Sequence, residues 1–338
     1  MDLDKLAAVA QAMVADNKGL LAADESTGTI TKRFDTINVE STEDSRRDYR
    51  ELLFRAAGIR EYISGVILYD ETIRQSAADG TRFVDLMAKQ GIIPGIKVDA
   101  GAKPLAGSDN ETVTEGLDGL RDRVMEYVDL GAKFAKWRAV IKIGDEMPTG
   151  YAIHANAHAL ARYAKICQEG GLVPIVEPEV LMDGDHDIHN CQLITEEILN
   201  CVFGELYAQE VALEGMILKP NMVISGLDAK NRADFDEVAD ETVATLMRCV
   251  PAAVPGIMFL SGGQSEIDAT MHLNVMNTNY KNLPWKLSYS YGRALQASVL
   301  KAWLGDSEKV KLAQGALMLR ASLNSAACAA EYKGESTE

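Results

Sequence analysis

The sequence predicts an α/β fold, and within that class a closed barrel of eight βα units in one domain. The 338 residues suit one large barrel or two ordinary domains. Eight short apolar runs each end in polar or charged residues, and segments with helical spacing separate them. Strands that alternate with helices form a parallel sheet, and eight such units over this length favour a (β/α)8 TIM barrel.

The eight predicted strands are near-continuous apolar runs, which indicates that both faces of the sheet are covered. They span residues 19–24, 65–70, 92–99, 132–140, 172–180, 215–221, 256–262 and 286–292. An open, doubly wound sheet is the alternative, and it usually carries a Gly-rich nucleotide turn. No GxGxxG follows the first run and no GxxxxGK[ST] occurs, so the closed barrel is the prediction.

Helical spacing fills the intervals between these strands. The predicted helices span residues 44–57, 81–90, 116–130, 151–169, 189–210, 236–249, 263–275 and 293–304. We expect an extra N-terminal helix within the amphipathic residues 1–18 and an extra C-terminal helix before the polar end. The domain prediction is therefore one barrel over 1–338, with a core of about 19–328 and a frayed C-terminus at 329–338.

Composition narrows the classes of function. The formal charge of −16 argues against a general attraction to nucleic acid or anionic membranes, although it leaves a local basic pocket open. The five cysteines form no CxxC pair, and an odd count in a large chain indicates free thiols. The first 18 residues lack the layout of a signal peptide. We therefore expect a protein of the reducing cytoplasm.

Charged residues collect where the predicted strands end, which is the catalytic end of such barrels. Eight of them fall at the ends of five strands: Asp24, Lys97, Asp99, Lys136, Arg138, Glu177, Glu179 and Lys219. Six of these form pairs two residues apart, so each pair points to one side of its strand. A single such charge usually reaches water or serves solubility. Desolvating these side chains costs several kcal/mol per ion, so a catalytic role explains the cluster better than a structural role does.

The run GMILKPNM (215–222) sets Lys219 among apolar neighbours. Lost hydration and the nearby cations Lys136 and Arg138 favour the neutral amine, which is the form that attacks a carbonyl to make a Schiff base. Carboxylates are then needed to move protons as the carbinolamine loses water, and Glu177 with Glu179 supplies such a pair. The pattern predicts imine chemistry at Lys219.

Two turns near the C-terminus suit an anionic handle on the substrate. LSGGQSE (260–266) and SYGRALQ (290–296) each lead from a strand into a helix through glycine, which leaves backbone N–H groups free at a helix N-terminus. Barrels often bind phosphate in the loops after their seventh and eighth strands. The sequence therefore predicts a phosphorylated small molecule as substrate.

Taken together, these stretches resemble class I fructose-bisphosphate aldolase. The matching motifs occur in the family's order from about residue 19 to residue 328 and include LAADESTGTI (21–30), GVILYDET (65–72), GIKVD (95–99), FAKWR (134–138), VPIVEPE (173–179), LKPNM (218–222), FLSGGQSE (259–266) and SYGRALQASVLKAW (290–303). The resemblance implies reversible cleavage of fructose 1,6-bisphosphate into dihydroxyacetone phosphate and glyceraldehyde 3-phosphate. It also implies no metal, no cofactor beyond the covalent imine, and a homotetramer.

The resemblance also implies a role for each site residue. Lys219 is the expected nucleophile, Glu177 the acid and base that Glu179 supports, and Asp24 the group that handles the proton of the C4 hydroxyl. Lys136 and Arg138 are expected to hold the reacting sugar. The expected C1-phosphate site is Ser261, Gly262, Gly263, Ser290, Gly292 and Arg293. The expected contacts to the other phosphate are Ser26, Thr29, Arg33 and Lys97.

Other interpretations remain open at this point. A related aldolase could prefer another ketose phosphate, such as sedoheptulose 1,7-bisphosphate, or the barrel could serve mainly as a scaffold or binding protein. Animal members of the family continue into a tail that ends in a functional tyrosine, and no equivalent is visible before Glu338. His154 and His158 have metal-ligand spacing on a predicted helix, but without HExxH an ordinary helix face is expected.

Overall fold

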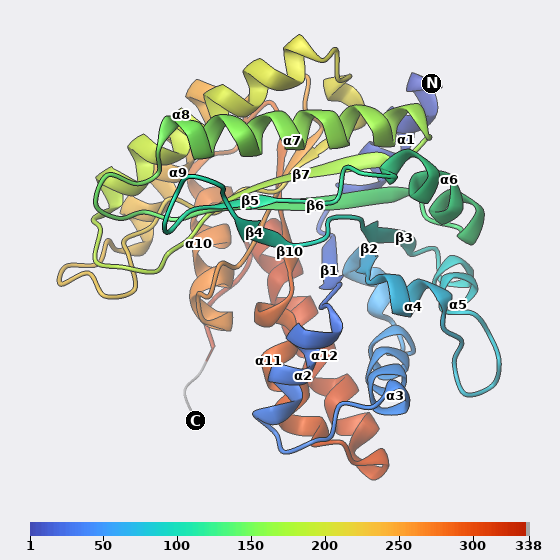
Figure 1. Ribbon diagram of the computed structural model, residues 1–338. Helices are drawn as coiled ribbons and strands as arrows, with labels where there is room; N and C mark the ends of the chain where they lie inside the picture. Colours follow the sequence, from blue (N-terminus) through green and yellow to red (C-terminus); the bar gives the residue numbers. More distant parts are fainter. Residues whose placement is uncertain (336–338) are drawn as a thin grey trace.

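Eight parallel strands close into a barrel, which confirms the predicted fold class. The computed structural model describes residues 1–335. Around the barrel the strands follow the order β1-β10-β9-β8-β7-β6-β3-β2 (Figure 1). Their bounds are β1 (Gly19–Ala23), β2 (Ile63–Leu68), β3 (Ile93–Lys97), β6 (Phe134–Ile141), β7 (Val173–Val180), β8 (Ile217–Leu218), β9 (Gly256–Phe259) and β10 (Lys286–Tyr291). Each predicted apolar run overlaps one of these strands, although β2 begins two residues before its run and β6 ends one residue after its run.

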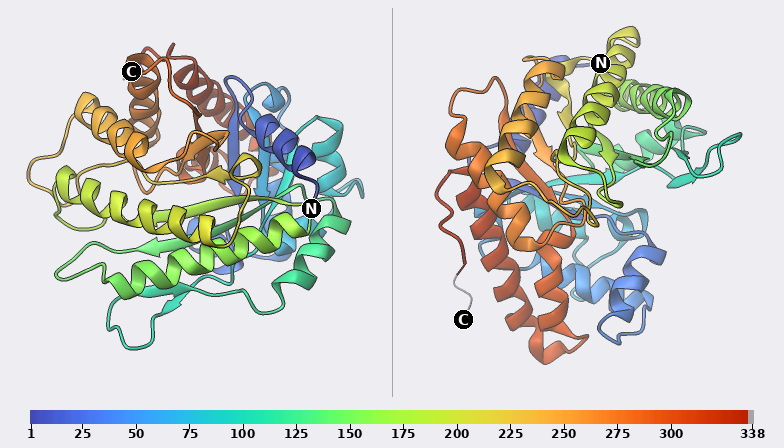
Figure 2. Two further views of the ribbon diagram at one scale, coloured as in Figure 1. Left: turned by 90° about the horizontal axis from the view of Figure 1, so that it is seen from above. Right: turned by 90° about the vertical axis from the view of Figure 1, so that its left-hand side faces the viewer.

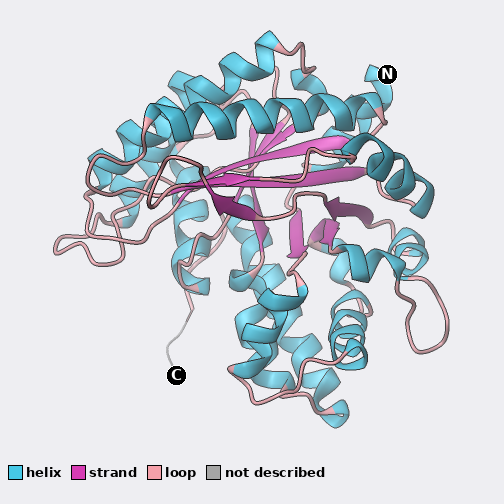
Figure 3. Ribbon diagram, in the orientation of Figure 1, coloured by secondary structure: helices cyan, strands magenta, loops and turns pink. Residues whose placement is uncertain are grey.

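Helices surround the barrel strands, as Figure 3 and both views of Figure 2 show. The helices between and before the barrel strands are α1 (Leu3–Met13), α2 (Thr27–Asp35), α3 (Glu43–Phe54), α4 (Asp70–Arg74), α5 (Phe83–Lys89), α6 (Leu120–Leu130), α7 (Gly150–Glu169), α8 (Ile188–Ala208), α9 (Phe235–Cys249) and α10 (Glu266–Asn279). After β10 come α11 (Arg293–Trp303) and α12 (Val310–Cys328). A two-stranded hairpin, β4 (Ala102–Pro104) with β5 (Thr112–Thr114), lies outside the barrel.

The part of the barrel interior that lies toward the amino ends of the strands is an apolar core. Side chains of several strands, among them Ile67, Phe134 and Ile217, form one buried cluster with residues of α1. The Phe134 ring takes the space beside β3, because a Cβ on Gly95 would lie 2.2 Å from it. Helix α1 thus packs over the amino ends of the strands and leaves the carboxyl ends to hold polar side chains.

The last described residues return along the outer helices. Tyr332 is buried, and its backbone N–H donates to Asn274 Oδ1 of α10 at 3.0 Å. Glu335 accepts from Arg320 of α12 at 2.5 Å. The frayed end expected at 329–338 falls partly outside the described residues, because these stop at 335. Across residues 1–335, none of the helices has both the length and the apolar character that a membrane span requires.

Candidate active site

The predicted site residues meet in one cavity of about 190 Å³ at the carboxyl ends of the strands. Every one of them except Gly263 lines it, although they come from segments between residues 24 and 293. Closure of the barrel brings these segments together, because each strand end contributes one or two side chains to a shared mouth. The lining residues are Asp24, Ser26, Thr29, Arg33, Lys97, Lys136, Arg138, Glu177, Glu179, Lys219, Ser261, Gly262, Ser290, Gly292 and Arg293.

Lys219 lies immediately after β8, deep in the mouth. Its backbone N–H donates to the carbonyl of Val176 at 2.8 Å, which continues the strand pairing with β7 by one residue before Pro220 ends it. The side chain is only 4% exposed, and Nζ lies 3.2 Å from Glu177 Oε1. A buried amine in contact with one carboxylate is held in place and has a proton acceptor at hand.

Glu177 and Asp24 share a second lysine. Lys136 Nζ lies 2.7 Å from Asp24 Oδ2 and 3.3 Å from Glu177 Oε2, so the contacts run from Asp24 through Lys136 and Glu177 to Lys219. Burial alone would raise the pKa of Asp24, but Lys136 and then Lys219 hold that pKa well below its ordinary value. Burial likewise opposes the charge on Lys136, yet Asp24 and Glu177 raise its pKa. These contacts therefore favour an ionised Asp24 carboxylate and a charged Lys136 ammonium group at neutral pH.

The remaining charged pairs surround this chain of contacts. Arg138, paired in register with Glu177 on β7, donates from Nε to Glu179. Lys97 at the end of β3 lies 2.8 Å from Asp99 Oδ1. Both members of the pairs Lys136/Arg138 and Glu177/Glu179 line the cavity, whereas in the third pair Lys97 lines it and Asp99 does not. Basic and acidic side chains alternate around the mouth, so the cations keep carboxylates as partners when no substrate is bound.

The turn after β9 offers backbone N–H groups to the same cavity. The Gln264 N–H closes the turn onto the Ser261 carbonyl at 2.9 Å. Gly262 and Gly263 have φ of +59° and +101°, which other residues rarely adopt. Gly263 lies outside the cavity lining, but a Cβ there would come within 3.3 Å of Arg293 Nη2, so the turn packs against that guanidinium.

The carboxyl end of β10 provides a buried polar group that lacks a partner. Ser290 Oγ is buried and has no hydrogen-bond partner among residues 1–335. Burial lowers the pKa of Arg293, and the neighbouring Arg33 lowers it further. Two arginines that repel one another beside an unpaired hydroxyl form a site that a dianionic phosphate would stabilise.

Glu25 is a site residue that the sequence analysis did not predict. Its carboxylate binds Arg33 and, at 2.6 Å, Arg50 Nη1, and Gln296 Nε2 donates to it at 3.0 Å. Glu25 lines the cavity and is 7% exposed. Its signal in the sequence was weak, because Glu25 follows Asp24 directly and its partner Arg50 lies on α3, the second helix after it.

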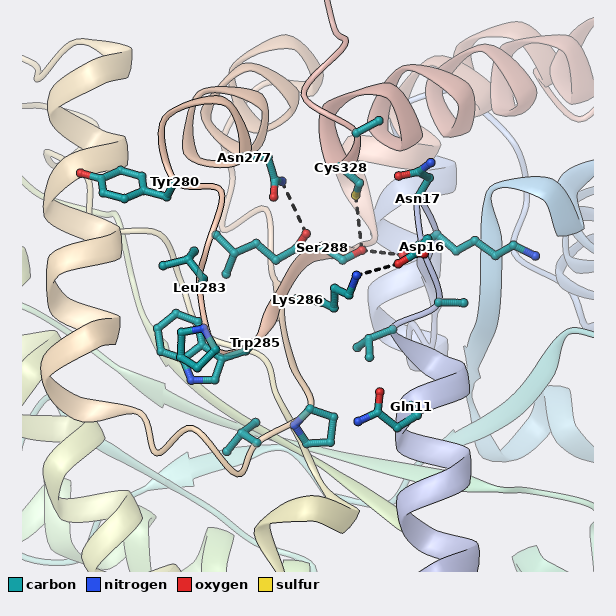
Figure 4. A pocket seen from close by; sticks show the side chains of 18 of the residues that line it. Gln11, Asp16, Asn17, Asn277, Tyr280, Leu283, Trp285, Lys286, Ser288 and Cys328 are labelled. Atoms are coloured by element: carbon teal, nitrogen blue, oxygen red, sulfur yellow. Dashed lines mark hydrogen bonds and ion pairs between the residues drawn. The ribbon is translucent and has the colours of Figure 1, made fainter.

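A larger cavity of about 500 Å³ lies at the opposite end of the barrel (Figure 4). It opens where β9 and β10 begin, and Figure 4 shows Lys286 reaching Asp16, a pair whose atoms are 2.7 Å apart. Both side chains of that pair are largely exposed. Catalytic groups of such barrels lie at the other end, and the buried chain of ionised groups is there as well.

His154 and His158 lie on the outer face of α7. Both face Glu205 of α8, at 3.6 Å and 3.0 Å, and both are more than half exposed. In the part of the chain that the structure describes, no three or more His, Cys, Asp and Glu side chains are grouped to hold a metal ion. These histidines therefore belong to an ordinary contact between two helices.

Comparison with known proteins assigns the chain to a family. A family model described as fructose-bisphosphate aldolase class-I matches residues 5–338. A probable fructose-bisphosphate aldolase class 1 from Xanthomonas campestris is 57% identical over 335 residues, covering 99% of this chain and all of the relative. Fructose-bisphosphate aldolase 4, cytosolic, from Arabidopsis thaliana is 56% identical over 318 residues, covering 94% of this chain and 81% of the relative.

A solved structure agrees with these relatives. Fructose-bisphosphate aldolase from Plasmodium falciparum, crystallised in complex with TRAP and a small molecule inhibitor, superposes with a TM-score of 0.97 at 49% sequence identity. The match covers 98% of this chain and 96% of that one. A family match over nearly the whole length and relatives above 50% identity lead to one conclusion: the chain belongs to the class I fructose-bisphosphate aldolases.

Proposed function

We propose that Lys219 is the nucleophile with which this class I aldolase reversibly cleaves fructose 1,6-bisphosphate into dihydroxyacetone phosphate and glyceraldehyde 3-phosphate. The observation that carries the proposal is the buried contact of 3.2 Å between Lys219 Nζ and Glu177 Oε1 inside the cavity at the carboxyl ends of the strands. Aldolases of this class are lyases that work through an imine with the substrate and need no metal.

The reaction begins when Lys219 gives a proton to Glu177, and the neutral amine that results attacks the C2 carbonyl and forms a carbinolamine. Glu177 gives a proton to the departing hydroxyl, which leaves as water, and a protonated imine results. Glu179 supports this step indirectly, because its contact with Arg138 keeps that guanidinium beside the reacting sugar. Lys136 keeps Glu177 and Asp24 in place throughout.

Carbon–carbon cleavage uses the imine as an electron sink. Asp24, which is ionised, takes the proton of the C4 hydroxyl while the C3–C4 bond breaks and its electron pair moves into the imine. Glyceraldehyde 3-phosphate leaves with a new carbonyl, and a neutral enamine stays on Lys219. Protonation of the enamine carbon and hydrolysis of the imine then release dihydroxyacetone phosphate and restore the amine.

The two phosphates orient the ketose against Lys219. We assign the C1 phosphate to the turn after β9 and to the carboxyl end of β10, where Ser290 Oγ is unpaired within residues 1–335 and Arg293 lines the cavity. The other phosphate is assigned to Ser26, Thr29, Arg33 and Lys97, which line the same cavity. Binding at both ends converts remote contacts into correct alignment of C2 with the amine.

Borohydride trapping tests the proposal directly. The protein is incubated with fructose 1,6-bisphosphate and borohydride, and the reduced adduct is mapped by mass spectrometry. We expect one adduct on Lys219, none in Lys219→Met, and an unchanged rate of cleavage after EDTA treatment. An adduct on another lysine, or none, would refute the assignment. Comparison of kcat/KM with sedoheptulose 1,7-bisphosphate decides which ketose is preferred.

We also propose that the chain is a single barrel domain over 1–338 that forms a homotetramer. Apolar side chains at the end of α8 support self-association, since Tyr207 is 87% exposed and borders a cavity of about 470 Å³ that includes Phe203, Leu213 and Pro251. Sedimentation velocity of the protein and of Tyr207→Ser measures this directly. A tetramer in which Tyr207→Ser changes nothing would move the interface elsewhere.

The cytoplasm is the proposed location. All five cysteines are free thiols, which suits a reducing compartment, and relatives from Arabidopsis thaliana and Pisum sativum are named cytosolic or cytoplasmic. Small sugar phosphates are the proposed partners, with no nucleic acid and no membrane among them, in keeping with the charge of −16. Fractionation of cells that produce the protein checks the location.

A further inference from the structure

The side chain of Gln264 is buried directly behind the Gly-Gly turn after β9. Its backbone N–H closes that turn, but its side chain does not line the active-site cavity and is not part of the proposed reaction. The residue is 7% exposed. Its carboxamide has two partners, because Oε1 lies 2.6 Å from His272 Nδ1 and Nε2 donates to Met222 Sδ at 3.6 Å.

Both partners are fixed parts of the barrel. His272 lies on α10, is 5% exposed, and its ring meets the Phe235 ring at the start of α9 at 5.0 Å, edge to face. Met222 is 1% exposed and follows Lys219 by three residues. Gln264 therefore connects the turn to a helix on one side and to the segment of the nucleophile on the other.

The direction of the short hydrogen bond follows from the acceptor, because Gln264 Oε1 cannot donate. Burial lowers the pKa of His272 to about 4; among its charged neighbours Asp268 raises it and Arg232 lowers it further. The ring is therefore neutral at physiological pH. Because a carboxamide oxygen can only accept, His272 carries its proton on Nδ1 and donates it to Gln264.

A phosphate site made of glycine N–H groups needs such a support. Gly262 and Gly263 lack side chains that would limit their backbone angles, so an unsupported turn would lose conformational entropy each time phosphate bound. We propose that Gln264 and His272 are positioning residues that hold the Gly262–Gly263 turn ready for the C1 phosphate. This inference rests on the function proposed above, which assigns that phosphate to the turn.

Variants of His272 separate positioning from mere packing. Asn places an amide nitrogen where the imidazole has Nδ1, whereas Gln places one where it has Nε2 and Leu has none. We expect His272→Leu and His272→Gln to raise KM for fructose 1,6-bisphosphate about tenfold, the effect of one lost hydrogen bond, with kcat within twofold of the wild type. We expect His272→Asn to restore KM. Gln264→Met should match His272→Leu, and the double variant should be no worse than either single one.

Binding of inorganic phosphate is measured alongside by calorimetry, and thermal unfolding reports on packing. Thr278→Ala, an exposed site on the same helix, is the matched control. Equal KM values for the Leu, Gln and Asn variants would overturn the inference, as would loss of thermal stability with KM and phosphate affinity unchanged. If the wild type formed no adduct on Lys219, the proposed function would fail instead. In that case, a tenfold loss of affinity for inorganic phosphate in His272→Leu, relative to the wild type, would still support the positioning role.

Discussion

Replacing Lys136 with methionine removes the cation between Asp24 and Glu177. Methionine matches the length of the lysine side chain but carries no charge, so packing changes little while two buried carboxylates lose a shared partner. The side chain of Lys136 is 5% exposed, and those of Asp24 and Glu177 are 12% and 4% exposed, so water cannot replace it fully. The substitution therefore tests the electrostatic contacts of Lys136 with Asp24 and Glu177 and little else.

The magnitude follows from the two distances. At an effective dielectric constant of about 20, contacts of 2.7 Å and 3.3 Å correspond to about 6 and about 5 kcal/mol of attraction. Desolvation of the ammonium group offsets several kcal/mol of that attraction, and the carboxylates left behind repel each other. We expect Lys136→Met to lower the free energy of unfolding by about 3–5 kcal/mol at pH 7.5.

The difference in unfolding free energy between the variant and the wild type should depend on pH, and the pKa of Asp24 gives the direction of that dependence. In the folded wild type the pKa of Asp24 is depressed below its ordinary value of 3.8, so its stabilising contribution is complete at neutral pH and is lost only as the pH falls through the depressed pKa. Without Lys136 the pKa of Asp24 rises from its depressed value, because burial raises it and only Lys219 and Lys97 still lower it, so protonation relieves the variant at a pH where the wild type is still unaffected. The stability difference should therefore shrink between pH 7.5 and pH 5.

Urea unfolding followed by fluorescence, at one fixed protein concentration, measures this difference. Lys142→Met is the control, because Lys142 lies just after the end of β6 and is exposed. We expect the control to change the free energy of unfolding by less than about 0.5 kcal/mol. A Lys136→Met protein as stable as the control at pH 7.5, or a gap that widens on acidification, would refute the reasoning.

Three further outcomes are expected. Glu177→Gln should lower kcat about 10²–10⁴-fold, because imine formation is slowed. Rapid quenching with borohydride measures how fast the adduct forms, and a rate equal to that of the wild type would contradict this prediction. Arg293→Ala should raise KM about 10–100-fold, the loss of charge-assisted hydrogen bonds to phosphate; an unchanged KM would place the C1 phosphate elsewhere. Glu25→Gln should lower the free energy of unfolding by about 3–5 kcal/mol because Arg50 would stay buried without a counter-charge, and urea titration checks it.

The eight strands could be predicted because each is a continuous apolar run, and their order followed from the rule that connects parallel strands through helices. The length of β8 could not be predicted so well. Residues 215–221 formed the predicted run, but the strand is only Ile217–Leu218, since Pro220 lacks the N–H that the next ladder bond needs. Helix α2 was not predicted, because TGTITKRFD is rich in threonine with an early glycine and has little apolar spacing.

At the mouth of the barrel, the residues could be predicted from the sequence but the contacts between them could not. Strand ends and alternation placed Lys136, Glu177 and Lys219 on one rim, since these rules are local. Nothing local indicated that Lys136 would bind Asp24, which belongs to another strand, or that Glu25 would neutralise Arg50. Such pairings depend on how the strands are staggered around the barrel, and that stagger is decided by the packing of the whole interior.

The ring of strands is closed by its first and last members, since Leu20 of β1 pairs with Ser290 of β10. During translation β1 is synthesised near the start of the chain and β10 near its end. Until β10 emerges, the nascent sheet has two unpaired edges, to which other unfinished chains can attach. Lys219 is synthesised long before Ser290 and Arg293, so we expect fragments that lack the C-terminal part of the chain to have no aldolase activity.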